Sequence, residues 1–208
     1  MNLKSGVFQK TSQPHLKIYH DEDKASHKIA VELVSMLPAN IEDRPIVFVC
    51  IGTDRSTGDS LGPLTGTMLK EKDIFPFHVY GTLEDPIHAV NLKTKLEEIK
   101  KKYKNPLIIG VDACLGKIKS VGSIQIGEGP LKPGAGVNKD LPEVGDYHIT
   151  GIVNVSGFME FFVLQNTRLN LVLNMAKVIA DGIHKASLIY HPKYSWTNLK
   201  LSRENHSG

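Results

Sequence analysis

The sequence predicts an α/β fold in which a mostly parallel, twisted sheet lies between two layers of helices. Residues 45–51 and 106–112 are short, continuous apolar runs, which are typical of strands buried on both faces of a parallel sheet. Segments with apolar residues at helical spacing alternate with these runs. The resulting order of strand, helix, strand, helix and strand is typical of βαβ units, and therefore of a three-layer domain.

The first half of the chain alternates helix and strand. Residues 1–18 are polar and patternless, and we expect a loose arm there. Residues 26–37 have apolar side chains at helical spacing, and Pro38 is expected to end that helix. The remaining elements predicted in this half are a strand at 45–51, a helix from 59 or 60 to 72, a strand at 77–83, a helix at 87–103 and a strand at 106–112.

The second half has a different character. Residues 122–127 alternate apolar and polar side chains, as a half-buried strand does, and they lead into a loop rich in Gly and Pro at 127–144. A last strand is predicted at 147–155, followed by helices at 157–165 and 168–185. Residues 190–208 are polar and are expected to be a loose tail. We therefore predict a single domain over 1–208 with its core at about 20–186.

Composition narrows the class of protein. Of 208 residues, 41% are hydrophobic and 23% charged, with a net charge of +3, which is ordinary for a soluble globular domain. The densest basic run, 93–104, contains Glu97 and Glu98 and has the pattern of a solvated helix face, so we expect no nucleic-acid partner. No apolar run approaches the ~20 residues that span a bilayer, and the N-terminus lacks a signal-peptide pattern. We expect a cytoplasmic protein without a membrane partner.

The two cysteines, Cys50 and Cys114, stand inside apolar stretches and have no Cys-x-x-Cys spacing. That pattern gives no support to a zinc site or a redox pair. We expect two reduced thiols in the core, as in a cytosolic protein.

Two aspartates stand where the predicted sheet would place a ligand. In open α/β sheets ligands bind at the carboxyl ends of the strands, and the segments there carry Asp59 and Asp112. Each has a structural alternative, because Asp59 could cap the following helix and Asp112 could tie down a turn. The loop 52–62 contains Gly and precedes a helix, but it matches neither phosphate-binding glycine motif.

A close pair of aspartates has a characteristic chemistry. Two neighbouring carboxylates cannot both ionise cheaply, so the pKa of one rises. One member can then activate water while the other donates a proton to a carbonyl oxygen. The same pair could instead supply hard oxygen ligands to a divalent cation.

Three segments resemble the spore germination protease family. Residues 49–63, ending Asp-Ser-Leu-Gly-Pro, are similar to its first motif, in which a strand and a glycine turn lead to an aspartate and Ala-Leu-Gly-Pro. Residues 109–115, with Asp-Ala-Cys-Leu, are similar to its second motif. Residues 122–139, with Pro-Gly-Ala-Gly-Val, are similar to its strand and Pro-Gly-x-Gly-Val loop. Over nearly its whole length the chain is identified as a member of the YyaC family of sporulation proteins.

The resemblance implies a fold shared with the germination protease and the hydrogenase maturation endopeptidases, phosphorylase/hydrolase-like, and an aspartic-type endopeptidase activity during sporulation or germination. It implies catalytic roles for Asp59 and Asp112 and no cofactor. It also implies a cytoplasmic location in a spore-forming bacterium, in the forespore or the mother cell, and a protein or peptide as substrate. The positions it implies for substrate binding are Gly52, Thr53, Gly58, Ser60, Gly134 and Gly136.

Several alternatives stay open. In the hydrogenase-processing branch the matching acids bind nickel with the help of a histidine, but here the matching segment begins at Asn154 and has no histidine. A divalent metal at Asp59 and Asp112, in a metal-dependent hydrolase, is one alternative, and a non-catalytic binding protein is another. His88 and His148 are candidates to assist the site. The apolar stretch 158–164 is expected in the core, with a contact between two copies of the chain as its alternative.

Overall fold

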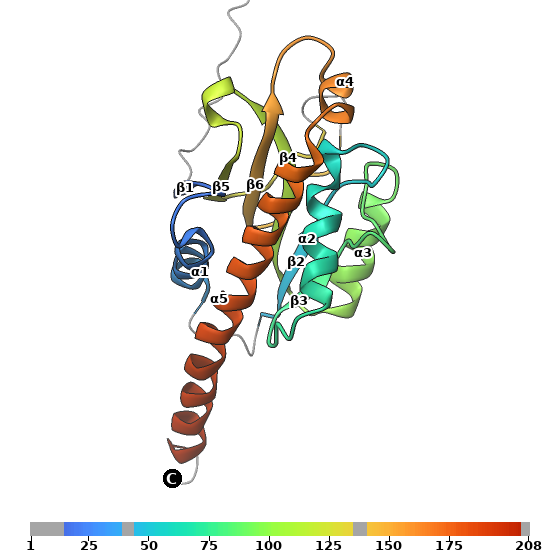
Figure 1. Cartoon of the computed structure of the whole chain (residues 1–208). Helices are drawn as coiled ribbons and strands as arrows, with labels where there is room; N and C mark the ends of the chain where they lie inside the picture. The colour runs from blue at the N-terminus through green and yellow to red at the C-terminus, as the bar shows by residue number, and fades with distance from the viewer. Residues whose placement is uncertain (1–14, 39–43, 135–140, 205–208) are drawn as a thin grey trace, which may run out of the picture.

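The computed structural model describes residues 15–38, 44–134 and 141–204, the last fourteen of these as helical backbone only. One six-stranded sheet forms the middle layer (Figure 1). Its strands are β1 (Leu16–Tyr19), β2 (Ile46–Cys50), β3 (His78–Tyr80), β4 (Leu107–Gly116), β5 (Ser123–Glu128) and β6 (Tyr147–Val155). The helices are α1 (Ala25–Met36), α2 (Leu61–Lys70), α3 (Leu92–Lys102), α4 (Glu160–Gln165) and α5 (Leu169–Glu204), with short 3₁₀ turns η1 (Gly58–Ser60) and η2 (Ile118–Ser120).

The sheet is mixed, with the strand order β1-β5-β6-β4-β2-β3. Strands β3, β2, β4 and β6 run parallel to one another, as predicted. Strand β5 is antiparallel to both β6 and β1. The chain leaves β2 through α2 to reach β3 on one side, and it later adds β4 on the other side of β2. The carboxyl ends of β2 and β4 therefore form a topological switch point, where ligands bind in such sheets.

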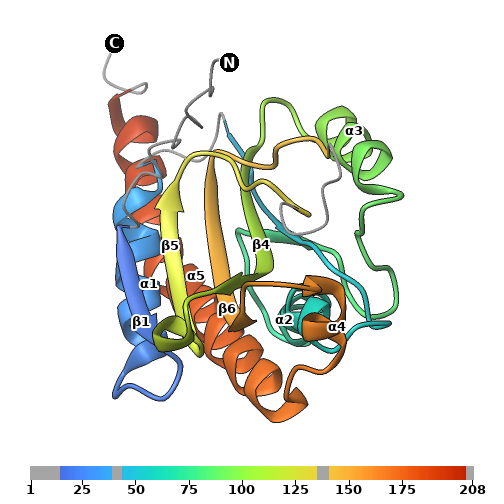
Figure 2. The same cartoon turned by 90° about the horizontal axis from the view of Figure 1, so that it is seen from above.

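The two faces of the sheet carry separate apolar cores. Helices α1, α2 and α5 cover one face, and α3 covers the other (Figures 1 and 2). Along β2, Ile46, Phe48 and Cys50 belong to the first core, whereas Val47 and Val49 belong to the second. Since successive strand residues point to opposite faces, a strand with helices on both sides must be apolar throughout. That is why residues 45–51 form a continuous apolar run.

Several predicted boundaries were wrong at the two ends of the chain. The predicted loose arm 1–18 includes Leu16 and Ile18, which form β1 against Ile126 and Ile124 of β5. The predicted tail 190–208 is helical as far as Glu204, in one helix with the segment predicted at 168–185. In both places the chain gains order from elements distant in sequence, or from a helix already under way, which composition alone does not indicate.

Other boundaries shifted inside the domain. The predicted strand 77–83 is shorter, and the helix predicted from residue 87 begins at Leu92. The strand predicted to end at Asp112 continues to Gly116 because β6 pairs with it that far. The stretch 158–164 is not core, since Phe158, Phe161 and Phe162 are 91%, 54% and 53% exposed.

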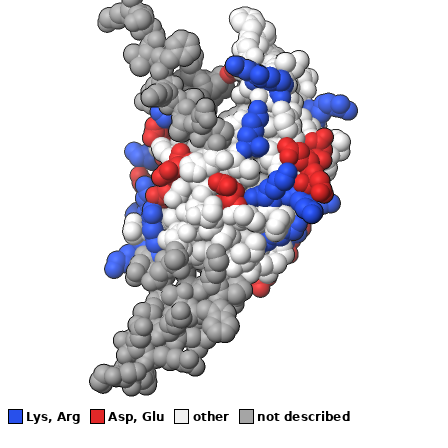
Figure 3. All heavy atoms as spheres, turned by 90° about the vertical axis from the view of Figure 1, so that its left-hand side faces the viewer, with Lys and Arg blue, Asp and Glu red and all other residues white. Residues whose placement is uncertain are grey.

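The charged surface has no single sign on the side that carries α1 and β1. Basic and acidic side chains are interspersed there (Figure 3). Lys28, for example, pairs with Glu22 at 3.1 Å. Among the described helices, none is long and apolar enough to cross a membrane.

Candidate active site

A cavity of about 650 Å³ opens at the carboxyl ends of β2 and β4. Five parts of the chain form it: the loop after β2, the loop before α3, the end of β4, the loop after β5, and helix α4. Its lining residues are Ile51, Gly52, Thr53, Asp54, Arg55, Asp59, Pro86, His88, Ala89, Val90, Asp112, Ala113, Cys114, Leu115, Lys132, Pro133, Gly134, Leu141, Glu160, Phe161 and Leu164. Both predicted catalytic aspartates are among them.

Asp59 reaches the cavity through a tight turn after β2. Gly52 adopts a φ of +145°, its N–H donates to the Ile87 carbonyl (2.8 Å), and the Thr53 N–H donates to the Asp59 carbonyl (3.1 Å). A Cβ on Gly52 would lie 1.9 Å from the Asp59 carbonyl oxygen. Glycine is therefore required here both by the backbone angle and by the close approach of the two segments. This packing fixes the backbone of Asp59 against the end of β2.

Asp59 is not a helix cap. It lies inside η1, the N-cap positions of η1 and α2 are Thr57 and Ser60, and neither helix start has a side-chain cap hydrogen bond. Burial raises the pKa of the Asp59 carboxyl above its ordinary value. The nearby Ser56 hydroxyl offsets part of that rise, although its Oγ has no fully formed hydrogen bond among the described residues. The capping alternative is therefore excluded, and the carboxyl remains available to the cavity.

Asp112 lies within β4 rather than after it, because β4 and β6 extend past the end of β2. Its Oδ1 accepts a hydrogen bond from the Ala113 N–H (2.8 Å). Burial raises the pKa of Asp112 to about 8, the Ala113 hydrogen bond opposes that rise, and the negative charge of Asp59 adds to it. Close to neutral pH, Asp112 is thus a neutral carboxylic acid that interacts with a second carboxyl group across the same cavity.

A thiol stands beside this pair. Cys114 is two residues after Asp112 on β4 and lines the cavity, whereas Cys50 lies in the core as predicted. Burial and the nearby Asp112 charge raise the pKa of the Cys114 thiol to about 12. The thiol therefore stays protonated and is a poor nucleophile.

The positions implied for substrate binding divide into two groups. Gly52, Thr53 and Gly134 line the cavity. Gly58 and Ser60 are outside its lining: a Cβ on Gly58 would meet Leu164 at 2.7 Å, and the Ser60 hydroxyl donates to the Thr57 carbonyl (2.7 Å). Gly58 therefore allows Leu164 to pack closely against η1, and the Ser60 hydrogen bond holds the turn. Gly136 lies outside the described residues.

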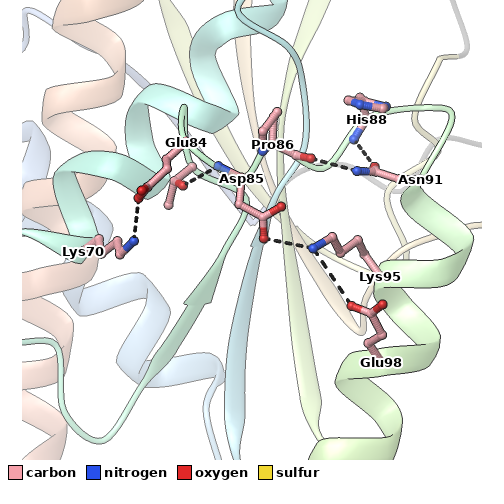
Figure 4. Close-up of polar contacts among 9 residues, drawn as sticks. Lys70, Glu84, Asp85, Pro86, His88, Asn91, Lys95 and Glu98 are labelled. Carbon is pink, nitrogen blue, oxygen red and sulfur yellow. Dashed lines mark hydrogen bonds and ion pairs between the residues drawn. The ribbon is translucent and has the colours of Figure 1, made fainter.

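The two candidate histidines also differ. His148 is not among the lining residues, and its Nδ1 is 3.0 Å from the Gly129 carbonyl oxygen. His88 lines the cavity on the loop between β3 and α3 (Figure 4). The backbone N–H of His88 donates to Asn91 Oδ1 (2.8 Å), and Asn91 Nδ2 donates in turn to the Pro86 carbonyl (3.0 Å). Asn91 therefore shapes the wall that carries His88.

The first prediction concerns this wall. Asn91→Ala removes both of these hydrogen bonds, and we expect a loss of about 1–2 kcal/mol in stability, concentrated locally. Amide hydrogen exchange should become faster at residues 87–92. Asn166→Ala removes a single exposed side-chain bond to the Phe162 carbonyl. It serves as the control and should leave exchange at 87–92 unchanged. Equal exchange in both variants would show that Asn91 does not hold the wall.

Some residues of the cavity lining were not predicted from the sequence. Arg55, Lys132 and Glu160 bring charges to its lining, and Phe161 brings an apolar ring from α4. The sequence could have indicated Cys114, because it is two residues from Asp112 on the same strand. The others are contributed by segments whose position depends on tertiary packing, so local sequence gave no indication of them.

A divalent metal ion bound at Asp59 and Asp112 is an alternative that the sequence leaves open. Within the described residues, no three His, Cys, Asp or Glu side chains are grouped so that they could hold one. Asn154, which stands where the nickel branch has its histidine, donates from Nδ2 to the Val163 carbonyl (3.3 Å) and to Thr167 Oγ1 (3.2 Å). It therefore ties β6 to α4 and to the turn between α4 and α5.

Comparison with known proteins identifies relatives of this chain. Residues 17–182 match the family described as "Protein of unknown function (DUF1256)". The chain is also 64% identical over 185 residues to the "Uncharacterized protein YyaC" of Bacillus subtilis (strain 168), which covers 88% of this chain and 89% of that protein. The chain therefore belongs to the DUF1256 family, together with YyaC of Bacillus subtilis.

Proposed function

We propose that this protein is an aspartic-type peptidase related to the spore germination protease, in which Asp59 and Asp112 are the catalytic pair. The observation that carries the proposal is that Asp59 and Asp112 line one cavity, where burial raises the pKa of Asp112 to about 8. A carboxylic acid that is protonated near neutral pH can donate a proton to a carbonyl oxygen. The motifs around both aspartates, and the α/β fold that presents them, support the same proposal.

Asp59 and Asp112 have different roles because the first is ionised and the second is protonated. Asp59, as the carboxylate, takes a proton from water while the water oxygen attacks the peptide carbonyl carbon. Asp112 donates its proton to the carbonyl oxygen, which gives a neutral tetrahedral diol. Asp59 then passes its proton to the amide nitrogen, and the C–N bond breaks. The diol returns a proton to Asp112 as the new carboxylic acid forms, so both residues are restored.

The test uses peptides prepared by tryptic digestion of a bacterial proteome, incubated with the protein and read by mass spectrometry. The double variant Asp59→Asn/Asp112→Asn, purified identically, is the blank for contaminating proteases. We expect new peptide ends with the native protein and none with the double variant. Equal cleavage by both proteins would refute the proposal.

The pH dependence follows from the direction of both shifts. Since the proton on Asp112 is required, cleavage should fall as the pH rises through about 8. Since Asp59 must be ionised and its pKa is raised, the acid limb should lie above the ordinary range of an aspartate. Rates measured from pH 4 to pH 10 check this prediction. Activity that increases above pH 8 would contradict the role of Asp112 as the acid.

Two outcomes would favour other functions. Peptide binding without cleavage would indicate a non-catalytic binding protein. Loss of cleavage on addition of a chelator, with recovery on addition of one divalent metal, would indicate a metal-dependent hydrolase. A role in sporulation is part of the proposal and is tested separately, by deletion of the gene and by spore counts.

A further inference from the structure

One edge of β4 has no neighbouring strand inside the cavity. Pairing between β2 and β4 ends at Cys50 and Val111, where the Ile51 N–H donates to the Val111 carbonyl (2.7 Å). The chain then turns away at Gly52, which bonds to Ile87. Strand β4 continues to Gly116 with β6 on its other side. Within the described residues, β4 is therefore paired on one side only after Val111.

The direction in which the N–H and C=O groups of β4 point follows from its hydrogen bonds to β2. Val111 bonds toward β2, and backbone groups two residues apart on a strand point the same way. The groups of Ala113 therefore face the side that β2 has left. The Ala113 N–H on that side bonds to the Asp112 carboxyl. The catalytic acid thus stands directly at the start of the open edge.

This edge borders the cavity, and no strand among the described residues pairs with it there. Four consecutive residues of β4, from Asp112 to Leu115, line the cavity. A strand that showed the cavity one face only would contribute alternate residues, so a run of four indicates that the strand edge itself borders the space. Natural proteins usually cover or charge such an edge, because it pairs readily with another chain.

Part of the cavity lining is apolar. Phe161 and Leu164 of α4 line the cavity, and Val90, which is 87% exposed, lines it from the loop before α3. The cavity lining carries both acids and the cations Arg55 and Lys132, so its charges do not favour a strongly charged ligand of either sign. An uncharged, extended backbone with apolar side chains matches both features, since its amides pair with the edge and its side chains pack on α4.

We propose that the cavity binds an extended polypeptide segment as an added strand along Ala113–Leu115 of β4, with an apolar side chain of that segment against Phe161 and Leu164. The added strand takes the place that β2 would occupy if it continued. This inference rests on the proposed function, because it brings the carbonyl of the bound segment beside Asp112. It assigns the substrate class as unfolded or extended protein segments and excludes helical or folded ones.

The experiment uses the double variant Asp59→Asn/Asp112→Asn, which cannot cleave, and a random heptapeptide library displayed on phage. A selected heptapeptide is then synthesised with a single N-methyl group at each amide in turn. Only Ala113 and Leu115 point to the open side, and the Ala113 N–H is already bonded to Asp112, so the bound chain pairs through few of its amides. N-methylation should weaken binding about tenfold or more at one or two amides that are two positions apart, and not at the amide between them. Equal effects at all positions, or no selected binder, would overturn the inference.

A matched pair of variants tests the apolar contact. Phe161 and Phe158 are both exposed phenylalanines at α4, but only Phe161 lines the cavity. Phe161→Ala in the double variant should weaken binding of the selected heptapeptide about tenfold, whereas Phe158→Ala should change it about twofold or less. Equal effects of the two substitutions would place the peptide elsewhere.

The inference and the proposed function fail in different ways. If the N-methylated series shows alternation but the native protein leaves the heptapeptide intact, strand addition stands and the peptidase proposal fails. If the native protein cleaves peptides but the series shows no alternation, the peptidase proposal stands and strand addition fails.

Discussion

Replacement of Asp112 by asparagine should lower peptide cleavage about a thousandfold or more. The asparagine side chain keeps the size of the aspartate and can still accept the hydrogen bond from the Ala113 N–H. It has no acidic proton to give to the substrate carbonyl, and general acid catalysis of this kind is worth about 10²–10⁴-fold. Initial rates on the cleaved tryptic peptides, compared with the native protein, measure the loss.

The same substitution should stabilise the fold at alkaline pH. A carboxyl whose pKa is raised to about 8 in the folded state, and is ordinary in the unfolded state, favours folding at low pH. That contribution is lost as the pH rises from about 4 through 8, because the unfolded chain ionises Asp112 first. Asparagine cannot ionise. We expect Asp112→Asn to be more stable than the native protein by about 2 kcal/mol or more at pH 9, and similar to it at pH 4.

Urea unfolding at the two pH values checks this expectation. Asp73→Asn is the matched control, because Asp73 is exposed at the far end of α2 and its Oδ1 accepts a hydrogen bond from the Phe75 N–H, which asparagine can preserve. This control should keep both activity and stability close to native at both pH values. A native-like pH dependence of stability in Asp112→Asn would show that the pKa of Asp112 is not raised.

Gly52→Ala should strongly destabilise the loop that carries Asp59. An alanine at φ +145° is strained, and its Cβ would lie 1.9 Å from the Asp59 carbonyl oxygen, which belongs to the backbone and cannot rotate away. We expect a loss of about 3 kcal/mol or more in the free energy of unfolding, together with loss of cleavage because Asp59 is displaced. Chemical unfolding and peptide cleavage assays provide the two measurements.

Gly129→Ala is the control for backbone angle alone. Gly129 also has a positive φ, +95°, but a Cβ there would meet nothing within 4 Å. We expect a loss of about 1 kcal/mol with activity retained. Equal destabilisation by both substitutions would show that the close approach of Asp59 to Gly52 adds nothing beyond the backbone angle.

The sequence by itself determined the central layer of the fold and the position of the segment that carries Asp59. The runs at 45–51 and 106–112 are apolar throughout because β2 and β4 lie between two cores, and this requirement leaves a local signal. The helices at 26–37 and from 59 or 60 to 72 were likewise confirmed within a few residues, since an amphipathic helix shows its period locally. The placement of Asp59 and Asp112 at one sheet edge followed from strand order alone.

Tertiary structure decided the features that depend on partners distant in the chain. Strand β1 exists because β5 offers it an edge, and β4 extends past Asp112 because β6 pairs with it as far as Gly116. This extension sets the Asp112 carboxyl inside the protein, where burial raises its pKa, and it leaves β4 with an edge that no other described strand pairs with. Helix α4 and the loop before α3 complete the wall only after the chain has folded. The sequence indicated the two aspartates as a candidate pair, while long-range pairing determined their burial and the shape of the cavity around them.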